Sequence, residues 1–279
     1  MQFVYILIIL FAICVYKILE HAEYSLSFAI WFNILIGTLY FALSIFFAYV
    51  DITRQPYIYK LKLQKDACLH IEEYKEVFKR TFLKYIFVVA PMFMLVLFLL
   101  QQRYSIQHVD LSSPVYWIAS LLICYVITDF AAWFIHKALH YFPWLWDNVH
   151  SMHHKHIAPV AVSAFDAHPI ELIFWDILPF AIGPLLLGVN AAFFTMFSVI
   201  AIMNTVICHS GYDINYDKGH HDLHHEKLKC NYSGILSDTV MGTHIERKDI
   251  IYPRFDSLQK DLFDSYNKSC NTMGNYSRI

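Results

Sequence analysis

The chain has 279 residues, of which 57% are hydrophobic and 16% charged, and its formal net charge at pH 7 is −2. Because an average soluble domain has about 25% charged residues, this composition excludes an ordinary soluble protein, and the lack of a basic stripe excludes nucleic-acid binding. The six cysteines are scattered without a CxxC pair, so they predict neither a disulfide framework nor an iron–sulfur cluster.

Apolar runs of about 20 residues predict membrane-spanning helices. The first run lacks a basic leading segment and a small-residue cleavage site, so it predicts a retained membrane helix rather than a cleaved signal. In chain order, we expect spans at residues 3–19, 26–50, 82–100 and 115–135.

A further apolar stretch, residues 172–208, is interrupted by prolines and glycines at Pro179, Gly183, Pro184 and Gly188. It predicts a helical hairpin that enters and leaves the membrane on the same side, with neighbouring helices satisfying the carbonyls that the prolines free. Earlier in the chain, residues 59–84 mix apolar and basic side chains. They predict either an amphipathic helix along the membrane interface or a solvated linker.

The basic residues predict the orientation of the spans. Residues 51–84 contain eight lysines and arginines, whereas residues 101–114 contain only Arg103. We therefore expect residues 51–84 to face the cytosol. The fourth span then returns to the cytosolic face and delivers His136 there, and the hairpin keeps residues 209–279 on the same face.

Three clusters of histidines follow the fourth span, with the spacings HxxxH, HxxHH and HxxHH. Residues at i, i+3 and i+4 share one face of a helix, and imidazole is the commonest side-chain metal ligand. Eight imidazoles exceed the four ligands of a closed zinc site, so the pattern predicts a two-metal centre. Such ligands suit zinc, copper, iron and nickel, and the spacing does not separate iron from zinc. The clusters are His136 and His140; His150, His153 and His154; His221, His224 and His225.

Four more polar residues are candidates for the site. Asp129 lies inside an apolar run on the helix face of His136, so we expect it to accept a hydrogen bond from an imidazole N–H and orient that ring; the alternative is a helix-pairing aspartate. His168 and His209 flank the hairpin, and each is either a ninth ligand or a donor to a ligand. Asp222, within the third cluster, joins Asp129 and His168 as a candidate catalytic residue.

From about residue 129 to residue 243, these motifs resemble the membrane-bound fatty acid hydroxylase and sterol desaturase superfamily. The segments that carry the resemblance are TDFAAWFIHKALH, HSMHHKHIAPVAVSAFDAHPIE, HSGYD, HHDLHHEKLKCNYSG and DTVMGT. HSGYD, AHPIE and HHDLHH are most similar to the 4-methylsterol monooxygenases, and the stretch from HHDLHH to CN also resembles cholesterol 25-hydroxylases.

The resemblance implies a non-haem di-iron centre that uses dioxygen, with electrons from NAD(P)H passed on by a b-type cytochrome or its reductase. It also implies an endoplasmic reticulum membrane location with the site facing the cytosol, in agreement with the charge pattern. By motif, the eight clustered histidines would be the iron ligands, although purified protein can hold zinc instead.

We therefore expect an all-α, multi-pass membrane protein with about four transmembrane helices, a membrane hairpin and a cytosolic histidine-rich cap. Residues 1–114 would form N-terminal membrane helices with a cytosolic linker, and residues 115–279 the catalytic domain. The expected function is oxygen-dependent oxidation of a lipid C–H bond, foremost in a 4-methylsterol. The alternatives are a sterol side-chain or fatty acyl hydroxylase or desaturase, and a non-enzymatic protein that binds or transports zinc. Transporters generally hold their ligands near the bilayer midplane, unlike the site expected here.

Overall fold

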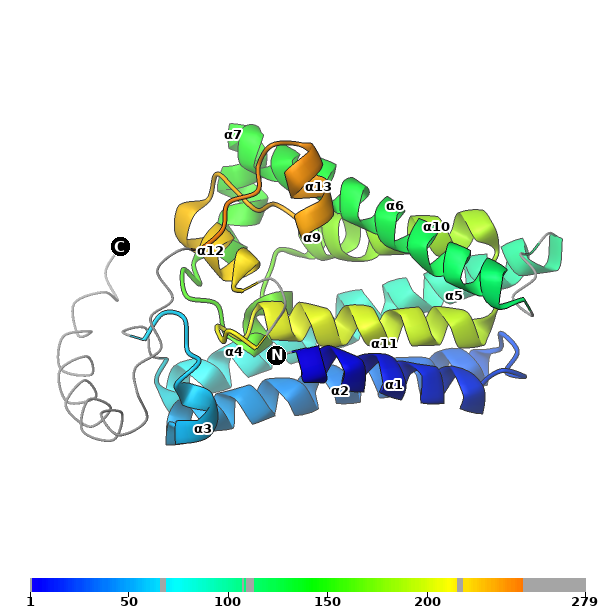
Figure 1. The fold of residues 1–279 in the computed structure, drawn as a ribbon, viewed down its shortest axis with the longest axis horizontal. Coiled ribbons are helices and arrows are strands. Elements are labelled where there is room, and N and C mark those ends of the chain that lie inside the picture. The colour runs from blue at the N-terminus through cyan, green and yellow to red at the C-terminus, as the bar shows by residue number, and fades with distance from the viewer. Residues whose placement is uncertain (1, 66–68, 107, 109–112, 215–217, 248–279) are drawn as a thin grey trace.

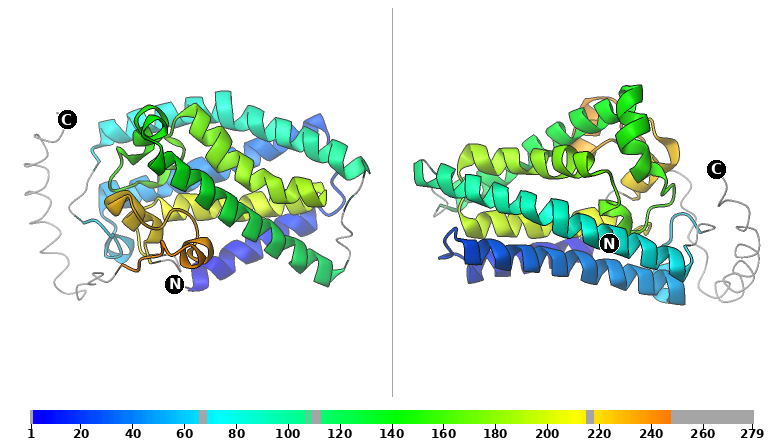
Figure 2. Two further views of the ribbon diagram at one scale, coloured as in Figure 1. Left: turned by 90° about the horizontal axis from the view of Figure 1, so that it is seen from above. Right: turned by 180° about the vertical axis from the view of Figure 1, so that it is seen from behind.

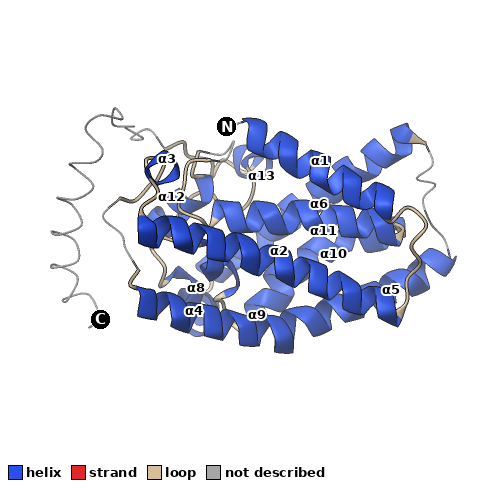
Figure 3. Ribbon diagram, turned by 90° about the horizontal axis from the view of Figure 1, so that it is seen from below, coloured by secondary structure: helices blue, strands red, loops and turns tan. Residues whose placement is uncertain are grey.

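The computed structural model describes residues 2–65, 69–106, 108, 113–214 and 218–247. In these residues the only β-type pairing is an isolated bridge between Lys62 and Tyr212, and all other regular structure is helical. Long helices run side by side, and most of the short helices gather at one end of them (Figures 1 and 3). We call this end the cap.

Five helical stretches of the described chain are long and apolar enough to cross a membrane, which confirms the expected all-α membrane protein. Many of their large apolar side chains are exposed, for example Phe87 and Leu186, as lipid-facing positions would be. Helix α1 (Gln2–Ile18) is apolar but shorter than the others. The five stretches are Leu26–Thr53, Ile71–Ile106, Pro114–Tyr141, Pro169–Leu187 and Ala191–Cys208.

The predicted third span starts earlier than its apolar run. Helix α4 (Ile71–Lys84) continues through the π-helical turn η1 (Tyr85–Val89) into α5 (Ala90–Ile106). A reciprocal cap fixes its start, where the His70 backbone N–H donates to Glu73 over 2.6 Å. Residues 71–84 are therefore a helix and not a linker. Its buried Tyr74 and Val77 and its exposed charged side chains agree with the amphipathic reading, whereas its place along the membrane interface stays a prediction. The π turn ends two residues before Pro91, whose ring would clash with the carbonyl of residue 87 in a regular α-helical turn.

The fourth span and the hairpin pack closely against each other. Helix α6 (Pro114–Tyr141) contacts α10 (Leu178–Leu187), and Figure 2 shows from above how the long helices lie together. A Cβ atom on Gly183 would lie 2.8 Å from the Cα of Cys124, so a glycine is needed for the two backbones to approach this closely. This contact holds the histidine-bearing end of α6 beside the start of the hairpin.

The two arms of the hairpin run from the cap to the opposite end of the long helices and back. Its outgoing arm comprises α9 (Pro169–Glu171), the π-helical segment η4 (Leu172–Ile177) and α10. The arm ends at Gly188, whose φ of 62° is the left-handed conformation that glycine adopts without strain. The returning arm is α11 (Ala191–Cys208), which packs on α1 and on α2 (Leu26–Thr53).

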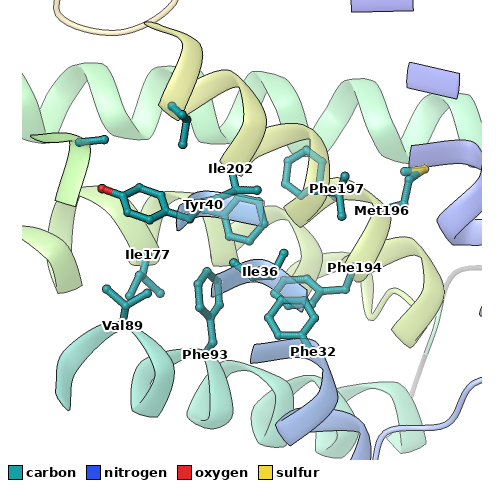
Figure 4. Packing of buried hydrophobic residues seen from close by; sticks show 14 of the residues in the cluster. Phe32, Ile36, Tyr40, Val89, Phe93, Ile177, Phe194, Met196, Phe197 and Ile202 are labelled. Atoms are coloured by element: carbon teal, nitrogen blue, oxygen red, sulfur yellow. The ribbon is translucent and has the colours of Figure 1, made fainter. Parts of the chain in front are cut away.

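Aromatic side chains from both halves of the chain share one core. The ring centroids of Phe32 and Phe93 lie 5.4 Å apart, and those of Phe32 and Phe194 also lie 5.4 Å apart; Figure 4 shows these residues together. Burying such rings is a main stabilising term. The core cluster contains residues from both sides of position 114, and the domain boundary expected there stays a prediction.

The remaining short elements build the cap. They are α3 (Pro56–Tyr59), α7 (Pro143–Leu145), η2 (Trp146–His150), α8 (Ser151–His154), η3 (Ala161–Phe165), α12 (His220–Lys227) and α13 (Ile235–Val240).

Candidate metal centre

Nine histidines from four segments of the chain come together at the cap. The last turns of α6 carry His136 and His140. The π-helical segment η2 and the following α8 carry the second cluster, α12 carries the third, and His209 is the C-cap of α11. The segments distant in sequence thus meet at one place, as the sequence predicted.

The first histidine group consists of His136, His140, His150, His154 and His224, whose ligand atoms all lie within 4.8 Å of one another. Nε2 of His136 lies 2.9 Å from Nε2 of His150 and 3.3 Å from that of His140. Nε2 of His224 lies 3.2 Å from Nε2 of His140 and of His154. All five rings therefore direct the same nitrogen toward one point.

The second histidine group consists of His153, His209, His221 and His225, again within 4.8 Å of one another. The Nε2 atoms of His209 and His221 are 2.9 Å apart, and His209 and His153 are 3.3 Å apart. His209, which the sequence left as a ninth ligand or a donor, takes the same inward orientation as the other eight.

Each HxxHH cluster is divided between the two groups. Positions four residues apart stay together, because they lie almost in line on a helix, and the intermediate position at i+3 turns toward the other group. The groups adjoin, since the ring centroids of His154 and His225 lie 4.5 Å apart. The first group thus takes His150, His154 and His224, and the second takes His153, His221 and His225.

The outer nitrogens of several rings are fixed by hydrogen bonds. Where Nδ1 donates its proton to an oxygen, the neutral ring carries a lone pair on Nε2. Three rings donate from Nδ1 to backbone carbonyls: His136 to Tyr232, His209 to Thr205 over 2.9 Å and His224 to Cys230 over 2.6 Å.

A carboxylate fixes a fourth ring. Nδ1 of His150 donates to Oε1 of Glu171 over 2.9 Å, and both side chains are fully buried. Carboxylates in this position orient a ligating imidazole and raise its basicity. Glu171 lies in the AHPIE segment, but the sequence reading gave it no role.

Inward-facing lone pairs at these separations repel one another unless a cation lies between them. Two adjoining groups of five and four imidazoles fit two metal ions of the kinds that prefer nitrogen ligands. The side chains of His136, His153 and His224 are inaccessible to solvent, so no water shell competes for these nitrogens.

Burial also keeps the cap histidines neutral. It lowers the pKa of His150 to about 3, with the neighbouring His224 adding to the effect. It lowers the pKa of His209 and of His224 to about 4 despite their hydrogen bonds to backbone carbonyls, which act the other way. A metal-binding imidazole must be unprotonated, and these three are unprotonated at neutral pH.

Asp129 does not hold an imidazole. Its carboxylate accepts hydrogen bonds from the backbone N–H groups of Gly234 at 2.6 Å and Ser237 at 2.9 Å, and from the hydroxyls of Ser233 and Ser237. It lies seven residues before His136, about 10 Å along the helix axis, which is too far to reach that ring. We interpret Asp129 as the anchor of the segment that brings Tyr232 to His136.

The other two candidate catalytic residues also lie outside the histidine groups. His168 is half-buried and accepts a hydrogen bond from the N–H of Ile170, so it caps helix α9. Asp222 is buried and accepts hydrogen bonds from Gln64 and Arg247. Asp222 thus ties α12 to its surroundings, and its predicted catalytic role lacks a contact that would support it.

Two further residues support the site without belonging to either histidine group. Trp175 packs its ring 4.2 Å from the ring of His136, measured between centroids. Asp238 accepts hydrogen bonds from His220 at 3.0 Å and from the backbone N–H of Tyr232 at 2.9 Å. The DTVMGT motif contains Asp238, but no spacing rule relates it to Tyr232.

Comparison with known proteins identifies the family of the chain. The fatty acid hydroxylase family model matches residues 121–243, which include all nine histidines. A Dictyostelium discoideum protein named as a methylsterol monooxygenase is 30% identical over 213 residues, covering 70% of this chain and 77% of that protein.

The chain belongs to the fatty acid hydroxylase family.

Two other relatives show the breadth of the similarity. A methylsterol monooxygenase of Arabidopsis thaliana is 31% identical over 160 residues, which cover 51% of this chain and 57% of that protein. A very-long-chain aldehyde decarbonylase of Oryza sativa is 32% identical over 141 residues, covering 45% and 52%. The chain thus spans little more than half the length of these two relatives. No solved structure matches it.

This fatty acid hydroxylase family member is an oxidoreductase. An apolar cavity of about 380 Å³ lies beside its second histidine group. His209 and His221 of the second histidine group border the cavity at the cap. The side chains of Ile36, Phe93 and Phe197, visible in Figure 4, line it between the spanning helices. A volume of this size is in the range of small-molecule sites.

Proposed function

We propose that this chain is a membrane-bound di-iron oxygenase that oxidises a C–H bond of a lipid. The observation that carries the proposal is that His209 and His221 of the second histidine group line an apolar cavity between helices long and apolar enough to span a membrane, and that the first group adjoins the second. The two groups would each hold one ion. When bound, two iron ions supply the activation of dioxygen and the oxidation of an unactivated C–H bond.

The protein's own residues would perform the remaining tasks. Glu171 and the carbonyls of Tyr232, Thr205 and Cys230 orient the ligating rings through their Nδ1 protons. Trp175 packs against His136 and excludes water from the first histidine group. The cavity holds the substrate in an apolar environment, which protects a strong oxidant from water.

We propose a sterol, foremost a 4-methylsterol, as the substrate. Two relatives are named as methylsterol monooxygenases. The cavity is lined largely by rigid aromatic and branched side chains, among them Phe93, Phe180 and Ile202, a wall that favours a rigid apolar ligand. The relative named as a very-long-chain aldehyde decarbonylase keeps fatty acyl oxidation as the alternative within the family.

We further propose that the cap faces the cytosol at the endoplasmic reticulum membrane, where a b-type cytochrome or its reductase supplies electrons. The basic residues of 51–84 support this orientation through the positive-inside rule. Arg80, Lys84 and Lys155 surround the buried Asp166 in the cap, at 2.8, 2.8 and 2.9 Å. Three basic side chains around one carboxylate leave a positive surface suited to an acidic electron donor.

Lipid profiling of a sterol-oxidase-deficient host that expresses the chain tests this function. Wild type should remove the accumulated 4-methylsterols, and His224→Ala should not. His21→Ala is the matched control, because the His21 side chain is 95% exposed and lies outside both histidine groups. Unchanged sterols with altered acyl lipids would move the assignment to fatty acyl oxidation. Unchanged lipids together with zinc transport would reject an oxygenase.

A further inference from the structure

Three buried polar atoms of cavity-lining residues have no hydrogen-bond partner in the described residues. They are Nε1 of Trp175, Oδ2 of Asp176 and Nδ1 of His220, whose other ring nitrogen is already paired with Asp238. Trp175 and Asp176 both belong to the π-helical segment η4. A π-helical turn inserts an extra residue into a helix and is frequent at functional sites.

Other polar side chains of the same wall are already paired. The hydroxyl of Ser198 donates to the carbonyl of Phe194 over 2.7 Å, and the hydroxyl of Thr128 donates to the carbonyl of Pro179. A carboxyl group within a membrane-spanning segment is costly and is a functional candidate by default. Asp176 is therefore the group on this wall that most needs a partner from outside the chain.

Asp176 lies at the metal end of the cavity. The neighbouring residue Trp175 contacts the ring of His136, and the ring centroid of Trp175 lies 5.9 Å from that of His153. Consecutive Cα atoms are about 3.8 Å apart, so a ligand held by Asp176 is held beside the histidine groups. His209 and His221 border the same cavity.

We propose that Asp176 binds a hydroxyl group of the lipid substrate and thereby selects hydroxylated lipids. A hydroxyl donates one hydrogen bond and accepts others, so it matches the carboxyl oxygen of Asp176 and the N–H of Trp175 together. The carbon to be oxidised would then lie close to the carbon that bears the hydroxyl. This specificity rests on the proposed function, whereas the binding of the hydroxyl itself does not require turnover.

Binding of matched lipid pairs to the metal-loaded full chain in lipid nanodiscs tests the proposal. One pair is cholesterol and cholest-5-ene, which lacks the 3-hydroxyl; the other is octadecanol and octadecane. The variants are Asp176→Leu, which removes the hydrogen-bonding group, and Asp176→Asn, which keeps one of similar shape. Ser44→Ala is the control, because Ser44 is a buried residue of α2 whose oxygen is also unpaired but which does not line the cavity.

Wild type and Ser44→Ala should bind the hydroxylated member of at least one pair about tenfold more tightly than its partner, the value of about one hydrogen bond. Asp176→Leu should bind both members equally, and Asp176→Asn should keep part of the preference. The pair that is discriminated tells a sterol from a straight-chain alcohol. Equal binding of both pairs by wild type, or an undiminished preference in Asp176→Leu, would overturn the proposal. A preference that depends on Asp176 without any lipid oxidation in the host would reject the proposed function alone.

Discussion

Glu171 and His150 form a buried pair in which the imidazole Nδ1 donates to the carboxylate over 2.9 Å. Supporting contacts of this kind are worth about 10–100-fold in metal affinity or activity. Glu171→Leu should therefore weaken metal binding by about that factor, as measured by competition with a chelator. Glu171→Gln keeps an oxygen that accepts the hydrogen bond and should lose less. Wild-type affinity in the leucine variant would show that Glu171 does not position His150.

Single ligand substitutions should separate metal binding from membrane insertion. His153→Ala leaves three imidazoles in the second histidine group, and His224→Ala leaves four in the first. Both variants should lose lipid oxidation while remaining in the membrane fraction, and His153→Ala should lose more bound metal. Metal content per chain and product yield measure the two effects. Normal turnover in either variant would contradict the ligand assignment.

We expect Asp129 to contribute to the folding stability of the chain and not to the chemistry of the site. Its carboxylate accepts hydrogen bonds from two backbone N–H groups and two hydroxyls of residues 233–237. Asp129→Ala leaves these donors buried without an acceptor, which should cost about 3 kcal/mol or more and lower the melting temperature in detergent by about 6–10 °C. Asp129→Asn should lose less. An unchanged melting temperature in Asp129→Ala would reject the anchoring role.

The metal-depleted protein should be destabilised by acid. Burial holds the pKa of His150 at about 3 and those of His209 and His224 at about 4, against about 6.5 for an exposed imidazole. Between these values the unfolded chain binds more protons than the folded chain, so the free energy of unfolding falls as the pH falls. The loss is up to about 1.4 kcal/mol per pH unit for each histidine. Thermal unfolding of chelator-treated protein at about pH 7.5 and pH 5 measures it, and a higher melting temperature at pH 5 would be the opposite result.

The spanning helices and the histidine clusters could be predicted from the sequence, because each is encoded by a pattern that is local in the chain. The charge pattern of the loops then predicted that the clusters meet on one face of the membrane. Apolar runs of sufficient length predict helices, and HxxHH spacing predicts ligands on one helix face. The same spacing did not reveal that His153 and His154 belong to different groups, because that division depends on how separate helices pack in space.

Supporting contacts were harder to foresee. The backbone carbonyls of Tyr232 and Cys230 accept hydrogen bonds from the rings of His136 and His224. Every residue has a backbone carbonyl, so the sequence does not indicate which ones make such contacts. The imidazole contact expected of Asp129 rested on a helix face shared with His136, although two turns of helix separate them. Its contacts with Gly234 and Ser237 agree instead with the alternative, a helix-pairing aspartate. The continuity of residues 71–84 with the third span was not predicted, because their charged side chains interrupt the apolar pattern, while the helix itself has no break there.

Metal analysis of the purified, iron-reconstituted chain tests the central claim most directly. Two adjoining imidazole groups should hold about two iron ions per chain, and Mössbauer spectra should show that the two ions are magnetically coupled. At most one iron ion per chain, or two ions without coupling, would contradict a paired metal centre.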